Sequence, residues 1–128
     1  MSDITRILVV DDAATVRLFY RQVLEASGYH VEEAVNGYEG LEKALSGPFA
    51  LFVVDVNMPK MDGYSLLRRI RREPALQHVP AIMISTEADE AESLKAYDAG
   101  ANLYIVKPVR PEELERSVGM MVGRSAAQ

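Results

Sequence analysis

The chain has 128 residues, of which 48% are hydrophobic and 26% charged, as expected of one globular domain. Its formal net charge of −5 argues against broad binding to nucleic acid, which needs a basic surface, so we expect no nucleic-acid partner. The absence of cysteine excludes disulfides, thiol catalysis and cysteine metal sites.

The first ten residues, MSDITRILVV, do not read as a secretory signal, because they lack a basic start and a long apolar part. No later segment approaches the roughly 20 apolar residues that cross a bilayer. We therefore expect a cytoplasmic protein that does not insert into a membrane.

Five short apolar runs predict five strands, at residues 6–10, 30–34, 50–54, 81–85 and 103–106. The first, third and fourth runs are nearly continuous, as in central parallel strands that are covered on both faces. The second run, HVEEA, is polar enough to form an edge strand.

Amphipathic segments between and after these runs predict five helices. Their boundary signals are Gly28 after the first helix, Asn36 and Gly47 around the second, Pro74 after the third, Gly100 after the fourth and Pro111 at the start of the fifth. The apolar positions that mark the fourth helix are Ala91, Leu94 and Tyr97.

The basic run RRIRRE, at residues 68–73, belongs to the third helix. Leu66, Leu67 and Ile70 are expected to face inward and to leave the arginines in solvent. A solvated helix face is the favoured interpretation, and a stripe that docks a partner is the alternative.

Strands and helices that alternate five times predict an α/β fold, a doubly wound (βα)5 parallel sheet of five strands with helices on both faces. We expect residues 1–128 to form a single domain, with a core at about 5–123 and no output domain. In such sheets the working site lies beyond the carboxyl ends of the strands. A flavodoxin-like order, 2-1-3-4-5, would bring the ends of strands 1, 3, 4 and 5 together.

Polar residues collect where these four strands end: Asp11 and Asp12 after the first, Asp55 after the third, Ser85 on the fourth and Lys107 after the fifth. Each one alone would be an ordinary cap, turn or strand-end residue. Two like charges 4 Å apart repel by about 4 kcal/mol at an effective dielectric near 20, so three acids and one lysine need a proton or a cation. Oxygen ligands in an open site favour Mg²⁺, and the whole set suits phosphoryl transfer with Asp55 as nucleophile.

These residues, in this order, resemble the receiver domain of two-component response regulators, most closely the single-domain CheY-like regulators of chemotaxis. The stretches that carry the resemblance are ILVVDDAATVR, VVDVNMPKMDGYSLLRRIR, AIMISTEADE and DAGANLYIVKPV. They cover nearly the whole chain and imply a CheY-like fold.

The resemblance implies that Asp55 is the phosphoacceptor and that Asp12 binds Mg²⁺ directly, with Asp11 acting partly through water. Asp55 and the backbone carbonyl of Asn57 would be further ligands, and Mn²⁺ could replace Mg²⁺. Asn57 and Glu87 would occupy the positions that tune the lifetime of the acyl phosphate.

By the same resemblance, Lys107 would contact the phosphoryl group and its bond to Pro108 would be cis. Ser85 would be the switch hydroxyl, and Tyr104 the aromatic residue that moves inward when Ser85 turns toward the phosphate. Val109 stands where an aromatic residue is common, and we expect this change to loosen the packing near the switch.

The implied chemistry is phosphoryl transfer from the phosphohistidine of a histidine kinase or histidine phosphotransfer domain to Asp55, followed by hydrolysis. The chain would catalyse only these reactions on itself and would not be an enzyme in the usual sense. A monomer would then present a changed face, made by the fourth helix, fifth strand and fifth helix, to a target such as a flagellar switch component. The acidic residues Asp89, Glu90 and Glu92 leave the identity of this target open.

Alternatives remain at this stage. A phosphorelay intermediate would pass the group on to a histidine phosphotransfer protein. A haloacid-dehalogenase-like phosphatase would need a second Asp where Asn57 stands. A flavodoxin would want donors for a phosphate where Asp11 and Asp12 begin the loop, and a P-loop motif is absent.

Overall fold

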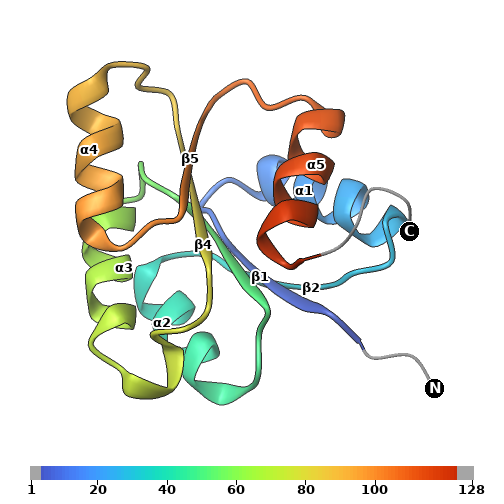
Figure 1. The fold of residues 1–128 in the computed structure, drawn as a ribbon, viewed down its shortest axis with the longest axis horizontal. Helices are drawn as coiled ribbons and strands as arrows, with labels where there is room; N and C mark the ends of the chain where they lie inside the picture. The colour runs from blue at the N-terminus through green and yellow to red at the C-terminus, as the bar shows by residue number, and fades with distance from the viewer. Residues whose placement is uncertain (1–3, 124–128) are drawn as a thin grey trace.

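The computed structural model describes residues 4–123, which form one parallel sheet of five strands flanked by helices (Figure 1). The strand order is β2-β1-β3-β4-β5, which confirms the predicted order and the edge position of the second strand. The strands are β1 (Arg6–Val10), β2 (His30–Ala34), β3 (Leu51–Asp55), β4 (Ala81–Ser85) and β5 (Leu103–Val106).

Helices cover both faces of the sheet, as the alternation of elements predicted. α1 (Ala14–Ala26) and α5 (Pro111–Met121) lie on one face, whereas α2 (Gly37–Ser46), α3 (Gly63–Arg71) and α4 (Glu90–Ala99) lie on the other (Figure 1). A short 3₁₀ helix, η1 (Pro74–Leu76), follows α3. Within residues 4–123, no helix is long and apolar enough to cross a membrane.

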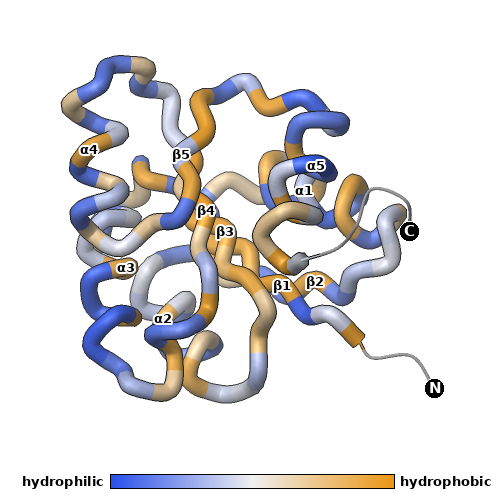
Figure 2. The backbone as a smooth tube through the Cα atoms, in the orientation of Figure 1, coloured by the Kyte–Doolittle hydropathy of each residue, from blue (hydrophilic) through white to orange (hydrophobic). Residues whose placement is uncertain are grey.

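Two hydrophobic cores result, one on each face of the sheet, and the apolar residues concentrate along the strands between them (Figure 2). Successive residues of a strand point to opposite faces. In β1, for example, Ile7 and Val9 pack with α1 and α5, while Leu8 and Val10 pack with α2 and α3. The nearly continuous apolar runs of the central strands follow from this double burial.

Helix α4 lies where it was predicted, but its large apolar residues do not face the core. Leu94 and Tyr97 are 59% and 45% exposed, whereas Ala96 and Ala99 are buried. The spacing of these apolar residues therefore located the helix, although Leu94 and Tyr97 lie on its exposed side. Because only small side chains are buried, α4 contributes little apolar area to the core.

The basic run of α3 is not wholly solvated, and the prediction is wrong for Arg71. Its guanidinium donates to the carbonyl of Gly100 from Nε (3.1 Å) and Nη2 (3.0 Å), and from Nη1 to those of Leu76 (3.0 Å) and Val79 (2.7 Å). Gly100 has a left-handed φ of 115°, and a Cβ there would lie 2.6 Å from Arg71 Cγ. The other arginines of the run are exposed: Arg68, Arg69 and Arg72.

Candidate functional site

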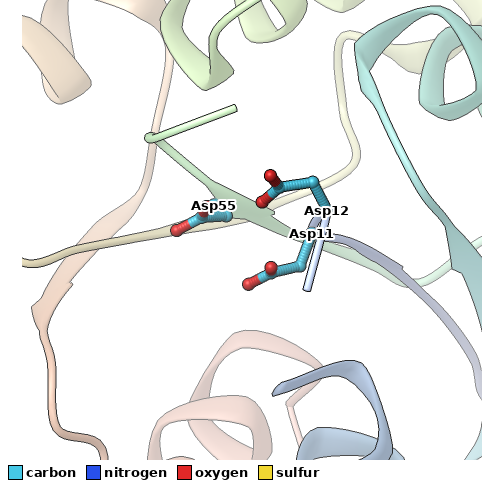
Figure 3. A group of neighbouring side chains, drawn as sticks. All are labelled: Asp11, Asp12 and Asp55. Carbon is cyan, nitrogen blue, oxygen red and sulfur yellow. The ribbon is translucent and has the colours of Figure 1, made fainter. Parts of the chain in front are cut away.

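Three carboxylates meet at the carboxyl edge of the sheet (Figure 3). Asp11 and Asp12 follow β1, and Asp55 is the last residue of β3, the strand that pairs with β1. One oxygen of each carboxylate lies within 4.8 Å of the others. Asp11 and Asp55 are only 1% and 4% exposed, while Asp12 lies at the exposed rim. The predicted acids therefore form one cluster that is open on the side of Asp12.

Lys107 supplies a positive charge to this cluster from the end of β5. Its Nζ lies 3.0 Å from Asp55 Oδ1 and 3.8 Å from Asp11 Oδ2, and its bond to Pro108 is cis, the form that the resemblance implies. These two carboxylate oxygens are buried and have no well-aligned hydrogen bond among the described residues. Lys107 thus neutralises part of the charge and leaves hydrogen-bonding capacity unused.

The pKa values of both buried acids are raised above their usual values. Burial, and after it the charge of Asp11, raise the pKa of Asp55 to about 6, although Lys107 opposes the rise. Burial also raises the pKa of Asp11, against the Ala13 N–H that donates to Asp11 Oδ1 at 2.9 Å and the charge of Lys107.

A hard divalent cation fits this donor set. Asp11 Oδ2 and Asp55 Oδ1 are buried with Lys107 as their nearby cation and no well-aligned hydrogen bond among the described residues, the third carboxylate is exposed, and every candidate ligand atom is an oxygen. Such a cation would offset both the burial and the mutual repulsion of the two acids, which raise their pKa values.

The loop after β3 holds the start of α3 directly against the acidic cluster. The Gly63 N–H donates to Val56 O at 3.0 Å, and a Cβ on Gly63 would lie 2.4 Å from the carbonyl oxygen of Asp55. Gly63 is therefore required by a close approach of two backbones, with no positive φ involved.

Ser85 lies at the end of β4 and is fully buried. Its Oγ accepts the N–H of Glu87 at 3.1 Å and donates to Asn57 Oδ1 over 3.5 Å. Asn57 and Glu87 themselves are exposed. The structure thus brings the predicted switch hydroxyl into contact with both residues that the resemblance links to phosphate lifetime.

Tyr104 joins the same network from β5. Its half-buried side chain packs on the core beneath α4, and its hydroxyl donates to the carbonyl of Glu87 at 2.6 Å. Glu87 is therefore held on one side by Ser85 and on the other by Tyr104. The resemblance coupled Ser85 with Tyr104, but the connection of the two through Glu87 was not predicted from the sequence.

Val109 lies on the opposite face of the sheet from Tyr104, and the loosening of the packing near the switch stays a prediction. It packs with the core beneath α1 and α5. With Phe19, Tyr20 and Pro108 it lines an open, mainly apolar groove of about 480 Å³ beside Lys107. Val109 can therefore influence access to Lys107 more directly than the packing of Tyr104.

Sequence reasoning missed one residue that shapes the acidic cluster. Arg17 of α1 donates from Nη1 to the carbonyl of Asp11 and from Nε to Glu33, both at 2.8 Å. It thereby fixes the backbone between the two acids and α1. Its position in the helix that directly follows Asp11 and Asp12 was the available signal, but an arginine at such a position is usually solvated.

Comparisons with known proteins agree with this geometry. The response regulator receiver domain family matches residues 7–119. The chain is 38% identical over 120 residues to chemotaxis protein CheY1 of Helicobacter pylori, which covers 92% of this chain and 97% of CheY1. It is also 38% identical over 122 residues to the transcriptional regulatory protein ResD of Bacillus subtilis, covering 95% of this chain but 50% of ResD.

Solved structures give the same result. The crystal structure of chemotaxis protein CheY4 of Vibrio cholerae superposes with a TM-score of 0.89 at 31% identity, covering 93% of this chain and 99% of CheY4. The fold, the family match and the similarity over most of both chains all indicate the same family. The chain belongs to the response regulator receiver domain family of two-component systems.

Proposed function

We propose that this receiver accepts a phosphoryl group on Asp55 from the phosphohistidine of a histidine kinase or histidine phosphotransfer domain. The observation that carries the proposal is the cluster of three carboxylates within 4.8 Å, with the ammonium of Lys107 3.0 Å from Asp55. Phosphoryl transfer depends mainly on positioning and on neutralising the charge of the transferring oxygens, and these groups are suited to both.

Mg²⁺ would be held by Asp11, Asp12, Asp55 and the backbone carbonyl of Asn57, and Mn²⁺ could replace it. When bound, the ion supplies positive charge to the acids and to the phosphoryl oxygens. The unused buried oxygens of Asp11 and Asp55 support this assignment.

In the transfer step, a carboxylate oxygen of Asp55 attacks phosphorus as the bond from phosphorus to the imidazole nitrogen breaks. The imidazole leaves with the electron pair of that bond and takes up a proton, while Lys107 neutralises a phosphoryl oxygen. Water later cleaves the acyl phosphate and restores Asp55. Asn57 and Glu87, both exposed beside the site, would tune the rate of this hydrolysis.

The signal would leave the site through Ser85. If its hydroxyl turns to donate to a phosphoryl oxygen, it gives up its contacts with Asn57 and with the N–H of Glu87. Glu87 would then move, and Tyr104, which binds its carbonyl, would move with it. The surface of α4, β5 and α5 would shift to a second population that a target protein binds.

We further propose a role in chemotaxis for a cytoplasmic monomer, with a flagellar switch component as target. Support comes from the similarity to CheY1, which spans 97% of that protein, whereas the similarity to the transcriptional regulator ResD spans 50%. A role as phosphorelay intermediate is the alternative. It predicts rapid transfer of the phosphoryl group from Asp55 to a histidine phosphotransfer domain.

The direct test is incubation with acetyl phosphate, with and without Mg²⁺, followed by measurement of the intact mass. We expect one phosphoryl adduct in the presence of Mg²⁺, its loss in Asp55→Asn, and its retention in Asp98→Asn, which changes an exposed aspartate on α4. Absence of an adduct from the unmodified protein would contradict the assignment of Asp55.

A further inference from the structure

Helix α3 holds both ends of α4 through two residues on the same face. Tyr64, in its first turn, contacts Glu92 near the start of α4, and Arg71, in its last turn, contacts Gly100 at the end of α4. The two residues are about two helical turns apart, which places them on one side of α3. They reach two points of α4 that are far apart along its axis.

The contact at the first turn depends on a single hydroxyl group. Tyr64 Oη lies 2.8 Å from Glu92 Oε2 and 3.1 Å from the Glu92 carbonyl oxygen, and its side chain is buried. Burial raises the pKa of Tyr64, and the Glu92 carboxylate raises it further, so the hydroxyl keeps its proton and donates. Lys95 lies 3.4 Å from Glu92 Oε1 and 6.0 Å from the centre of the Tyr64 ring.

The contact at the far end is stronger. Two hydrogen bonds from Arg71 reach the Gly100 carbonyl at the end of α4, two more hold the guanidinium on the carbonyls of Leu76 and Val79, and its charge strengthens each one. The only buried side chains of α4, Ala96 and Ala99, also lie in this half of the helix. Before them, Glu90 and Ala91 are exposed. The first half of α4 is therefore held mainly by Tyr64.

Tyr64 also adjoins the acidic cluster. The preceding residue, Gly63, packs on the carbonyl of Asp55 without room for a side chain. A pocket of about 440 Å³ separates this loop from α4, and its lining includes Asn57, Tyr64, Glu87 and Glu92. Tyr64 thus bridges the loop after Asp55 and the first turn of α4, and its hydroxyl also interacts with the Tyr104 side chain of the switch network.

We propose that Tyr64 is a positioning residue, a latch that keeps the first half of α4 in its unphosphorylated position while Arg71 serves as the pivot at the other end. The regulatory consequence rests on the proposed function. When Ser85 releases Glu87, the segment that leads into α4 is free to move, and the Tyr64–Glu92 contact opposes that movement.

Amide hydrogen exchange on the unphosphorylated chain of residues 1–128 tests the latch itself. The exchange rates of Tyr64→Phe are compared with those of the unmodified protein. We expect the amides of residues 92–95 to exchange about fivefold faster, the effect of losing one hydrogen bond, with no change at residues 99–102. Tyr38→Phe, at an exposed position of α2, is the matched control and should change neither segment. Unchanged exchange at 92–95, or equal acceleration in both segments, would overturn the proposal.

The regulatory consequence is tested with beryllofluoride and Mg²⁺, a probe that mimics the acyl phosphate. Because coupling between two sites is reciprocal, Tyr64→Phe should bind beryllofluoride about fivefold more tightly, and Tyr38→Phe should bind like the unmodified protein. Equal affinity in Tyr64→Phe and the unmodified protein would overturn this part. If the unmodified protein bound no beryllofluoride and gave no adduct with acetyl phosphate, the proposed function would fail, and the exchange experiment would still decide the latch.

A double-mutant cycle separates the latch from a general loosening of the fold. Tyr64→Phe and Glu92→Ala each remove one side of the shared contact. If the latch operates, their effects on exchange at residues 92–95 are less than additive, because both substitutions remove the bond to the carboxylate and only Tyr64→Phe also removes the bond to the Glu92 carbonyl. Fully additive effects would show that the two side chains act independently and would contradict the latch.

Discussion

Two regions of this receiver hold buried charge, and they differ in how completely that charge is paired. At the carboxyl edge of the sheet, Asp11 and Asp55 keep buried oxygens without a hydrogen bond among the described residues, and one lysine faces three acids. Around Arg71, at the far end of α4, one guanidinium is matched to three backbone carbonyls. Incomplete pairing leaves the first region able to bind something further, whereas complete pairing makes the second a rigid support.

Removing the guanidinium should have the largest effect, because it breaks the well-paired region. Arg71→Ala leaves three carbonyl groups without their donor, and we expect a loss of about 3 kcal/mol in the free energy of unfolding. Urea denaturation measures this loss. Arg68→Ala, at an exposed position of the same helix, should change stability by less than about 0.5 kcal/mol. Similar values for the two variants would show that the pairing around Arg71 has no energetic importance.

Neutralising Asp55 should have the opposite sign. The pKa of this carboxyl rises from 3.8 to about 6 on folding, so the folded state binds more protons than the unfolded state between these values. Stability of the metal-free protein should therefore fall as pH rises from about 4 to about 6. Asp55→Asn should abolish most of this fall and gain about 2 kcal/mol at pH 7, somewhat less than the full shift would give because the cluster is open to solvent.

Thermal or urea unfolding at several pH values in the presence of a chelator measures this effect. Asp98→Asn is the control, because that carboxylate is exposed on α4. If the stability of Asp55→Asn and of the unmodified protein changed equally with pH, a group other than Asp55 would be responsible for the fall.

Addition of Mg²⁺ should have the smallest effect and should make the two regions more alike. An ion that binds only the folded state stabilises it by RT ln(1 + [L]/Kd), about 1.4 kcal/mol at ten times the Kd. This gain should disappear in Asp12→Ala and persist in Arg68→Ala. Calorimetric titration gives the Kd, and unfolding at that multiple of it gives the gain. Equal stabilisation of Asp12→Ala would show that the ion binds at another place.

Much of the fold and of the acidic cluster could be predicted because parallel strands impose simple rules. Apolar runs separated by helical segments define the sheet, and residues that end neighbouring strands must meet at one edge. The sequence therefore predicts that Asp11, Asp12, Asp55 and Lys107 lie together. The pairing of β1 with β3 and of β4 with β5 brings these ends into one cluster.

The tertiary contacts of polar side chains could not be predicted in the same way. Arg71 reaches a carbonyl 29 residues away in sequence, and Tyr64 reaches a carboxylate 28 residues away. Helical periodicity predicts the direction of a side chain on its own helix, but it does not predict which residue of another element that side chain contacts. The residues that located α4 did not reveal its inner face for a related reason, since the residues that pack there are the small Ala96 and Ala99.

Glu87 has a consequence for how a cell could read this protein. Its N–H is bound by Ser85 and its carbonyl by Tyr104, so the two residues are linked through a single amino acid and cannot respond independently. Under the proposed function, this link favours a switch between two states without stable intermediate shapes. A graded signal must accordingly be encoded in the fraction of molecules in each state. The sensitivity of the response then depends on how a target protein responds to that fraction.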